Sequence, residues 1–361
     1  MQIPFVNLKK QSELEKKVIL KSVNKVLKKS NFILDNVNDV LEKKIARYTN
    51  SKYCALLNSG TDALTLALYV AGIKRNDEVI TCSNSFIASA AAIVHLGAKV
   101  KFVDVKDDQN INPKLIESKI TKKTKAIMPV HLTGRICDMT AIMKIAKKYN
   151  LKIIEDAAQS FGSKYKNKHA GTFGDVGCFS LHPLKNLNGI GDGGLIITNN
   201  KEYYQRIRSL RNHGIRDRNN VDEFGYVSRY DSLKATILMD RLKNLKLVIK
   251  KRRQNAKIYM KLINNPNVFI PEENKSEFNT YHTFVVQVKK RTELIKYLKK
   301  NGISTAIHYP IPIHLQKAFT NKNIQKLILP NTMRQSKEIL SLPINQFMTK
   351  KELQYISKKI D

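Results

Sequence analysis

The sequence VGCFSLHPLKNLNGIGDGGLIIT (residues 176–198) contains two apolar, β-rich runs, 176–180 and 194–198. The glycine-rich loop that joins them is too short for a helix, so it predicts one antiparallel pair of strands. Five further apolar runs precede this segment. They lie at 53–57, 78–82, 99–105, 126–131 and 152–156.

Helical patterns separate these runs. They lie at 9–30, Thr61–Ala71, Ser85–Leu96, Met139–Tyr149 and Lys201–Arg211. Strands this apolar, alternating with helices, predict an α/β fold with a large, mostly parallel sheet that is covered on both faces.

The pattern changes near residue 245. A basic helix, Leu245–Leu262, leads into a turn at 264–266, and then come a strand-like run at 281–288, a helix at 292–300 and a last helix near the C-terminus. We therefore expect a large α/β domain over 10–245. A smaller α+β C-terminal domain is expected over 246–361, together with residues 1–9.

Composition limits the classes of protein. The net charge of +34 over 361 residues would attract nucleic acid, acidic membranes or phosphorylated substrates. The lysines are dispersed over the whole chain, and the aromatics that stack on bases do not accompany them. A basic bias on solvated faces is therefore the favoured interpretation, with no nucleic-acid partner, although a nucleotide-linked substrate would benefit from the field.

Cysteine usage and hydropathy favour a cytoplasmic protein. Cys54, Cys82, Cys137 and Cys178 each stand beside apolar residues and show no metal-binding spacing, which predicts buried free thiols, a reducing cytoplasm and no metal site. No secretory signal is visible at the N-terminus, and no apolar stretch approaches the length of a membrane span.

Lys185 has an unusual setting in the loop between 180 and 194. It stands among serine, histidine, proline and asparagine residues and ahead of four glycines. A solvated surface lysine needs no such setting, whereas a lysine that forms a Schiff base needs fixed, crowded surroundings. We expect Pro183 to stiffen the approach and the glycines to let the backbone pass close to a bulky ligand.

Two more segments place polar groups at the ends of predicted strands. The stretch Asn58-Ser59-Gly60-Thr61-Asp62-Ala63-Leu64 offers helix N-terminal amides to a phosphate, although such residues also make ordinary N-caps. Asp156 ends the run 153–156, where ligands bind in α/β proteins. A helix N-cap or a surface acid is the alternative for Asp156.

Together the three segments supply phosphate donors, a carboxylate for a pyridinium nitrogen and a lysine for an aldehyde, the groups that pyridoxal 5'-phosphate (PLP) requires. With further motifs in the same order, the chain resembles the DegT/DnrJ/EryC1/StrS family of sugar aminotransferases, within the fold-type-I PLP enzymes. The motifs that carry the resemblance are Ile3-Pro4-Phe5, Val130-His131-Leu132-Thr133-Gly134, Glu155–Gln159, Gly171-Thr172-Phe173-Gly174-Asp175, Ser180–Leu187, Leu210-Arg211-Asn212-His213-Gly214, His308-Tyr309-Pro310 and Leu342-Pro343.

The resemblance implies roles for individual residues. Lys185 and Asp156 are catalytic: Lys185 holds the cofactor aldehyde, and Asp156 pairs with the pyridine nitrogen. Gln159 lies near the ring hydroxyl, and Phe86 stacks on the ring, with core packing as the alternative for this Phe. The phosphate is held by Gly60, Ser180 and the amides of Thr61 and Asp62. The residues near the sugar are His182, Arg229, His308 and Tyr309, for which an ordinary structural role is the alternative.

The sequence departs from the family pattern at Val227. Relatives usually have Asn at this place in the motif, where this chain has Gly225-Tyr226-Val227-Ser228-Arg229-Tyr230-Asp231. The family's Asn reaches the cofactor phosphate from the neighbouring subunit of a dimer. Val227 cannot donate that hydrogen bond, so Ser228, Arg229 or water must replace it, or the contact is lost. Lys234 stands where relatives usually carry Gln.

The implied reaction is ping-pong transamination. L-Glutamate is the expected donor, and the expected acceptor is a nucleotide-linked 3-keto or 4-keto-6-deoxyhexose in cell-surface glycan or lipopolysaccharide synthesis. An eight-carbon keto-sugar acid is the alternative acceptor. We expect a homodimer with composite active sites and no membrane partner.

Three other functions are alternatives to transamination. A dehydratase branch of the family has histidine in place of the lysine, and Lys185 argues against it. A non-catalytic PLP-fold sensor or regulator would need an added DNA-binding domain, and no helix-turn-helix precedes residue 30. A degenerate, cofactor-free paralogue would fit Val227, but the cofactor residues Asp156, Gln159, Ser180 and Lys185 are all retained.

Overall fold

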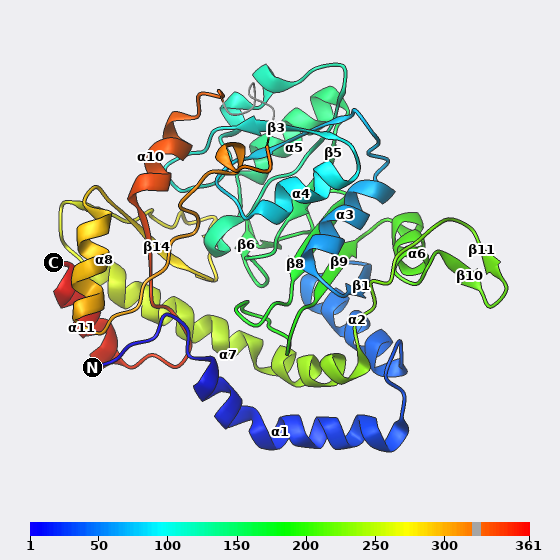
Figure 1. The fold of residues 1–361 in the computed structure, drawn as a ribbon, viewed down its shortest axis with the longest axis horizontal. Helices are drawn as coiled ribbons and strands as arrows, with labels where there is room; N and C mark the ends of the chain where they lie inside the picture. Colours follow the sequence, from blue (N-terminus) through cyan, green and yellow to red (C-terminus); the bar gives the residue numbers. More distant parts are fainter. Residues whose placement is uncertain (320–325) are drawn as a thin grey trace.

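A seven-stranded sheet organises the first two-thirds of the chain in the computed structural model, which describes residues 1–319 and 326–361 (Figure 1). The strand order is β1-β9-β8-β5-β4-β2-β3. Its members are β1 (Tyr53–Leu57), β2 (Glu78–Cys82), β3 (Lys99–Val103), β4 (Thr124–Ile127), β5 (Lys152–Asp156), β8 (Val176–Ser180) and β9 (Gly194–Thr198). Neighbours pair in parallel except at β9, which is antiparallel to both β8 and β1. The mostly parallel sheet and its antiparallel member are confirmed.

Both faces of this sheet are buried. Along β1, Cys54 and Leu56 belong to one apolar cluster, and Ala55 and Leu57 belong to the other, because successive strand residues point to opposite faces. The helices that cover the first face are α2 (Asn36–Thr49), α5 (Met139–Tyr149) and α7 (Ser232–Leu262). Those that cover the second are α3 (Gly60–Val70), α4 (Ile87–His95) and α6 (Lys201–Leu210). Burial on two sides explains why the strands are apolar throughout rather than alternating.

A third apolar cluster combines the two ends of the chain. It joins Ile3 to residues of the C-terminal third. The elements of this part are β12 (Val268–Phe269), β14 (Phe284–Val288) and β15 (Ile339–Leu342), which form an antiparallel sheet, with α8 (Arg291–Lys300), α10 (Pro330–Glu338) and α11 (Lys350–Ile360). Both termini lie on this side of the molecule, close to α8 and α11 (Figure 1).

Helix α7 corrects one predicted boundary. The basic helix expected from Leu245 begins at Ser232 and crosses residue 245 without a break. Its first half packs against the large sheet and its second half against the small one, so the apolar stripe changes partner along the helix. The division into 10–245 and 246–361 stays a prediction.

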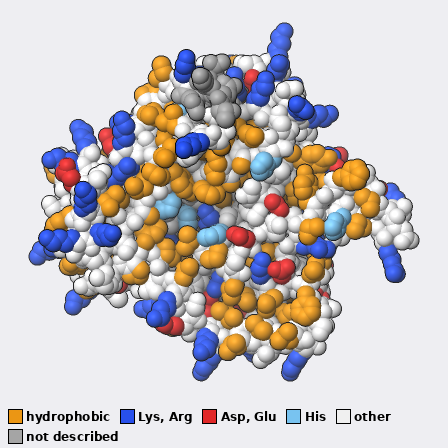
Figure 2. Space-filling view, viewed as in Figure 1, with side chains coloured by type: hydrophobic (Ala, Val, Ile, Leu, Met, Phe, Trp, Pro, Cys, Tyr) orange, Lys and Arg blue, Asp and Glu red, His pale blue; other side chains and the backbone are white. Residues whose placement is uncertain are grey.

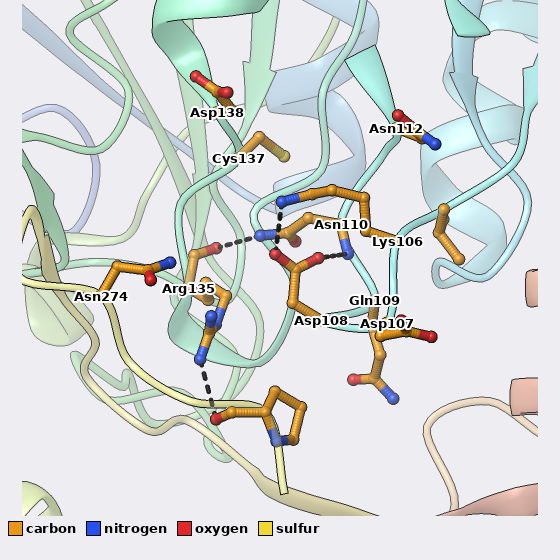
Figure 3. A network of polar contacts seen from close by, with 12 residues as sticks. Lys106, Asp107, Asp108, Gln109, Asn110, Asn112, Arg135, Cys137, Asp138 and Asn274 are labelled. Carbon is orange, nitrogen blue, oxygen red and sulfur yellow. Dashed lines mark hydrogen bonds and ion pairs between the residues drawn. The ribbon is translucent and has the colours of Figure 1, made fainter. Parts of the chain in front are cut away.

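Figure 3 shows a polar contact that ties the loop after β4 to the C-terminal third. The buried guanidinium of Arg135 donates to the carbonyls of Pro271 and Glu272 at 3.1 and 2.6 Å and pairs with the Glu277 carboxylate at 3.2 Å. Nearby, Asn110 Nδ2 donates to the carbonyl of Arg135 at 3.5 Å. A small sheet of β6 (Lys164–Tyr165), β7 (Lys168–His169) and β13 (Glu277–Phe278) lies beside this contact.

Two elements lie at the edge of this body. Helix α1 (Leu8–Lys29) packs along α7, and the hairpin of β10 (Ile215–Asp217) and β11 (Asn220–Val221) projects away from the rest of the chain (Figure 1). All four cysteines are buried and unpaired, as predicted. Within 1–319 and 326–361, no helix combines the length and the apolar character needed to cross a membrane.

Candidate active site

Asp156 lies at the end of β5, where the segment that follows β4 holds its backbone. Its N–H donates to the carbonyl of Pro129 at 2.9 Å, and its carbonyl accepts from the N–H of His131 at 2.9 Å. The side chain is 4% exposed, so it is not a surface acid. Its Oδ2 accepts from the Ser89 hydroxyl at 2.7 Å, and its Oδ1 accepts from the N–H of Ala158 at 3.2 Å.

Opposing influences act on the pKa of Asp156. Burial raises the pKa of Asp156 because it penalises the charged form, while the bonds from Ser89 and Ala158 and the charge of Lys185 lower it. The net direction is upward. Burial thus favours the neutral acid, and the hydrogen-bond donors favour the ionised carboxylate.

Glu155, the neighbour of Asp156, points to the opposite face of the strand and has a structural role. Its carboxylate accepts from the N–H groups of Gly171, Phe173 and Gly174, each at 2.7 Å, and from His131 Nε2 at 2.9 Å. One buried carboxylate thus joins three of the motifs that the sequence contains. It also holds the loop that follows β4 against β5.

Lys185 lies in residues 181–193, here called the lysine loop, between β8 and β9. Burial lowers the pKa of Lys185 to about 8, and the charge of Asp156 opposes this shift. A lysine with this pKa is partly neutral at pH 7 to 8, so its amine is available as a nucleophile or a base.

Helices α1 and α7 anchor the lysine loop. Asn188 and Gln11 exchange two hydrogen bonds, at 3.1 and 3.2 Å. Arg241 donates to the carbonyls of Asn188 and Gly189 at 2.9 and 2.8 Å and forms an ion pair with Glu15 at 2.6 Å. These contacts supply the fixed surroundings that a Schiff-base lysine needs.

The glycines of the lysine loop require a correction. A Cβ at Gly189 would lie 2.7 Å from the hydroxyl oxygen of Tyr230, and one at Gly193 would overlap the same ring. Beyond the loop, a Cβ at Gly194 would overlap the carbonyl oxygen of Ser59. These glycines make room for a buried tyrosine and for a neighbouring backbone, and not for a bulky ligand as expected.

The first turn of α3 and the end of β8 form a cradle for an anion. Ser59 caps the helix by accepting from the N–H of Asp62 at 3.0 Å. Within the described part of the chain, the N–H groups of Gly60 and Thr61 have no acceptor. A Cβ at Gly60 would lie only 2.9 Å from that of Ser180, so glycine brings the helix close to this hydroxyl. The amides free for a phosphate are those of Gly60 and Thr61, whereas the amide of Asp62, also expected to bind the phosphate, already donates to Ser59.

Phe86, Tyr309 and Gln159 gather beside Asp156. Phe86 is 55% exposed, so it is not packed in the core, and its ring centroid lies 5.7 Å from that of Tyr309. The Tyr309 hydroxyl accepts from Gln159 Nε2 at 3.3 Å, and Gln159 Oε1 accepts from the N–H of Thr133 at 2.8 Å. Burial raises the pKa of Tyr309 to about 12, and the charge of Asp156 contributes to this rise.

Three histidines lie within the electrostatic influence of Lys185. Burial lowers the pKa of His182, His282 and His308, and the charge of Lys185 adds to each shift. The pKa of His308 falls to about 4, so its ring is neutral at pH 7. His282 was missed by the sequence analysis, because a lone histidine in a strand-like run gives no signal. Figure 2 shows histidine side chains around the middle of this face.

Arg229 and Val227 belong to a segment here called the arm (residues 212–229), which carries the β10–β11 hairpin. Arg229 donates to Asn212 Oδ1 at 3.2 Å, and no described hydrogen bond or ion pair joins it to Lys185. The Val227 carbonyl accepts from Asn58 Nδ2 at 3.3 Å, and the Ser228 hydroxyl donates to Asn58 Oδ1 at 3.3 Å. The base of the arm thus lies beside the strand-to-helix junction that precedes Gly60.

Comparison with known proteins identifies the family. Residues 13–361 match the DegT/DnrJ/EryC1/StrS aminotransferase family. The chain belongs to this family. The chain is 41% identical over 360 residues to a protein of Aneurinibacillus thermoaerophilus named dTDP-3-amino-3,6-dideoxy-alpha-D-galactopyranose transaminase, with 99% of each chain covered. It is 38% identical over 364 residues to a protein of Geobacillus stearothermophilus named pleiotropic regulatory protein, with 100% of this chain and 98% of the relative covered.

Solved structures of this aminotransferase family share the fold. The crystal structure of DesV from S. venezuelae in complex with a ketimine intermediate superposes with a TM-score of 0.96 at 33% identity, covering 99% of this chain and 97% of that one. The predicted fold type I of PLP-dependent aminotransferases is confirmed. The chain is a PLP-dependent sugar aminotransferase.

The residues present fit PLP. The unpaired amides of Gly60 and Thr61 beside Ser180 suit its phosphate, and the buried carboxylate of Asp156 suits its ring nitrogen. Lys185, with its lowered pKa, suits the aldehyde. The site residues that the sequence analysis missed are Ser85, Ser89, Thr133 and His282. Thr133 lies within the quoted motif Val130–Gly134, but the motif does not show its contact with Gln159, and Ser89 meets Asp156 only through packing.

Proposed function

We propose that this aminotransferase moves an amino group from L-glutamate to a nucleotide-linked 3-keto or 4-keto-6-deoxyhexose. The observation that carries the proposal is an anchored lysine of pKa about 8 within the electrostatic influence of the buried Asp156 carboxylate, together with a helix N-terminus that has free amides. The name of the Aneurinibacillus relative supports a sugar linked to dTDP and aminated at position 3. The net charge of +34 favours an acceptor that carries phosphates.

Individual residues of the chain have separate roles in the reaction. When bound, PLP supplies an aldehyde for exchange with amines and a ring that accepts electron density. The Nζ of Lys185 takes the proton from the α-carbon of the donor and later delivers one to the carbon that receives the amine. The ionised carboxylate of Asp156 holds a proton on the ring nitrogen. The amides of Gly60 and Thr61 and the Ser180 hydroxyl bind the phosphate.

Phe86, Gln159 and Tyr309 have proposed roles around the ring. Phe86 covers one ring face, and its exposed position beside Tyr309 supports this role. Gln159 lies near the ring hydroxyl, oriented by the N–H of Thr133. His182, His308 and Tyr309 contact the sugar, and the neutral ring of His308 offers it a hydrogen-bonding group without a charge.

The proposed assembly is a homodimer with composite active sites. The arm supports it, because Phe224, Val221 and Tyr226 are 99%, 59% and 45% exposed and need a cover. Arg229 would then serve the site of the partner subunit. The proposed location is the cytoplasm, where four buried, unpaired thiols are stable, and the product would enter cell-surface glycans, including lipopolysaccharide.

Product analysis tests the function. The enzyme with PLP and ¹⁵N-labelled L-glutamate would be offered dTDP- and UDP-linked 3-keto and 4-keto-6-deoxyhexoses and an eight-carbon keto-sugar acid. We expect release of 2-oxoglutarate and an amino sugar with ¹⁵N, detected by mass spectrometry, only with a nucleotide-linked acceptor. Transfer to the eight-carbon acid alone would establish the alternative substrate.

A non-catalytic regulator is the second candidate, favoured by the name of the Geobacillus relative. It predicts that PLP binds while no acceptor in this panel is aminated. Amination of any acceptor by the wild-type chain, lost with Lys185→Ala, would exclude it.

A further inference from the structure

A chain of two hydroxyls leads from the start of α4 to Asp156. Ser89 Oγ lies 2.7 Å from Asp156 Oδ2, and Ser85 Oγ lies 2.7 Å from Ser89 Oγ. Ser85, Ser89 and Asp156 are 4%, 1% and 4% exposed, so this contact is shielded from bulk solvent. Ser85 precedes α4 (Ile87–His95) and Ser89 lies in its first turn, so this contact joins the loop after β2 to the helix. Phe86 lies between the two serines.

Proton counting fixes the direction of this chain. An ionised carboxylate only accepts hydrogen bonds, so Ser89 donates to Asp156. Ser89 has a single hydroxyl hydrogen, so Ser85 must donate to Ser89. Within residues 1–319 and 326–361, the Ser85 hydroxyl has no other partner that competes for its hydrogen.

We propose that Ser89, with Ser85 behind it, is a positioning residue that keeps Asp156 ionised and correctly oriented toward the ring nitrogen of the cofactor. The inference rests on the proposed function only in naming the reaction that Asp156 serves. The N–H of Ala158 bonds to Oδ1 and the Ser89 hydroxyl bonds to Oδ2, and together these two bonds fix the orientation of the carboxylate. Each oxygen can still accept one further hydrogen bond.

Electrostatics support this role. Burial raises the pKa of Asp156, and the bond from Ser89 is the strongest of the influences that lower it again. A buried carboxylate without this donor would favour its neutral form, which cannot hold a proton on the ring nitrogen. The titratable groups that face Asp156 are Lys185, His131, Tyr309, Cys82 and Cys178.

Nitrogen NMR of the bound cofactor tests the inference. Wild type, Ser89→Ala, Ser89→Thr and Ser85→Ala would each be loaded with PLP labelled with ¹⁵N in the ring. With Ser89→Ala, we expect the signal to move from the protonated toward the neutral position, and kcat to fall about 10- to 100-fold, the cost of one hydrogen bond to a charged group. Ser89→Thr keeps the hydroxyl and should restore both quantities. Ser85→Ala should give a smaller shift of the same sign.

An unchanged ¹⁵N signal in Ser89→Ala would overturn the proposal, because a merely structural serine would lower activity without moving it. The signal needs only bound cofactor, so it still tests the hydroxyl chain when the acceptor sugar has been assigned wrongly. Where Ser89→Ala does not fold, Ser89→Cys places a weaker donor in a similar volume and should shift the signal in the same direction.

Discussion

The centre of the active site and the arm differ in whether the chain itself buries and pairs their side chains. Asp156 is 4% exposed and has a donor for each carboxylate oxygen. Phe224 on the arm is 99% exposed, and Val227 is 55% exposed. One chain alone can therefore satisfy the groups that perform the chemistry, whereas the apolar side chains of the arm need a surface from outside the chain.

The arm is nevertheless held in place. Glu223, next to Phe224, accepts two hydrogen bonds from Arg206, both at 2.8 Å, and one from the Tyr69 hydroxyl at 3.1 Å. Polar contacts thus fix the arm on the large sheet domain and leave its apolar side chains uncovered. Contacts within the chain therefore fix where the arm lies, but they do not bury its apolar side chains.

The largest expected effect is at the centre, with Lys185→Ala. This variant should bind PLP without a covalent bond and lose overall transamination by at least about 10³-fold, because both amine exchange and proton transfer need the amine. Borohydride reduction of the wild type followed by peptide mapping should label Lys185. Lys201→Ala, an exposed lysine on α6, is the control. A label on any other lysine would contradict the assignment.

Asp156→Asn should lower turnover by about 10²- to 10³-fold, because a neutral amide cannot hold the proton on the ring nitrogen. Stability should change in the opposite sense. Since the pKa of Asp156 is raised in the folded protein, its contribution to stability is present at acid pH and lost as pH rises through that pKa. The apoprotein variant should therefore unfold at an equal or higher temperature than wild type at pH 8, as measured by calorimetry.

Asp107→Asn, which changes an exposed carboxylate, is the control for both measurements. Near-normal turnover in Asp156→Asn would show that Asp156 is a structural residue and not the partner of the ring.

On the arm, Phe224→Ser should weaken the homodimer. Burial of a Phe side chain is worth about 2 kcal/mol, so the dimer dissociation constant should rise at least about tenfold. Sedimentation at several protein concentrations measures it. Phe269→Ser, which changes a half-exposed Phe on β12, should leave association unchanged. A wild-type protein that is monomeric and fully active would refute the composite site.

The smallest effect is expected from Val227→Asn. Within their own chain, Ser228 and Arg229 bond to Asn58 and Asn212, while Val227 offers no side-chain donor at all. Restoring the amide should slow the loss of PLP about three- to tenfold, as expected for one partly exposed hydrogen bond to a charged group. Dialysis against a PLP scavenger measures this rate. Val221→Asn on the same arm should have no effect, and an equal effect there would remove the special role of position 227.

Several features could be predicted from the sequence because they depend on local order along the chain. The apolar runs predict strands that are buried on both faces, and Asp156 and Lys185 stand out by their place at the end of a run and within a glycine-rich loop. The antiparallel member follows from the short link between β8 and β9. Each of these follows from neighbours within about 20 residues.

Other features depend on packing between distant segments, and only the tertiary structure decided them. The Ser89 hydroxyl meets Asp156 across 67 residues, and Arg241 reaches the lysine loop from α7. Tyr230 fills the space beside Gly189 and Gly193 of the lysine loop. Sequence periodicity tells which face of an element is buried, but which side chain it meets depends on how the elements pack. The sequence therefore determined the fold and pointed to Lys185 and Asp156 as the candidate catalytic residues, and packing decided what surrounds them.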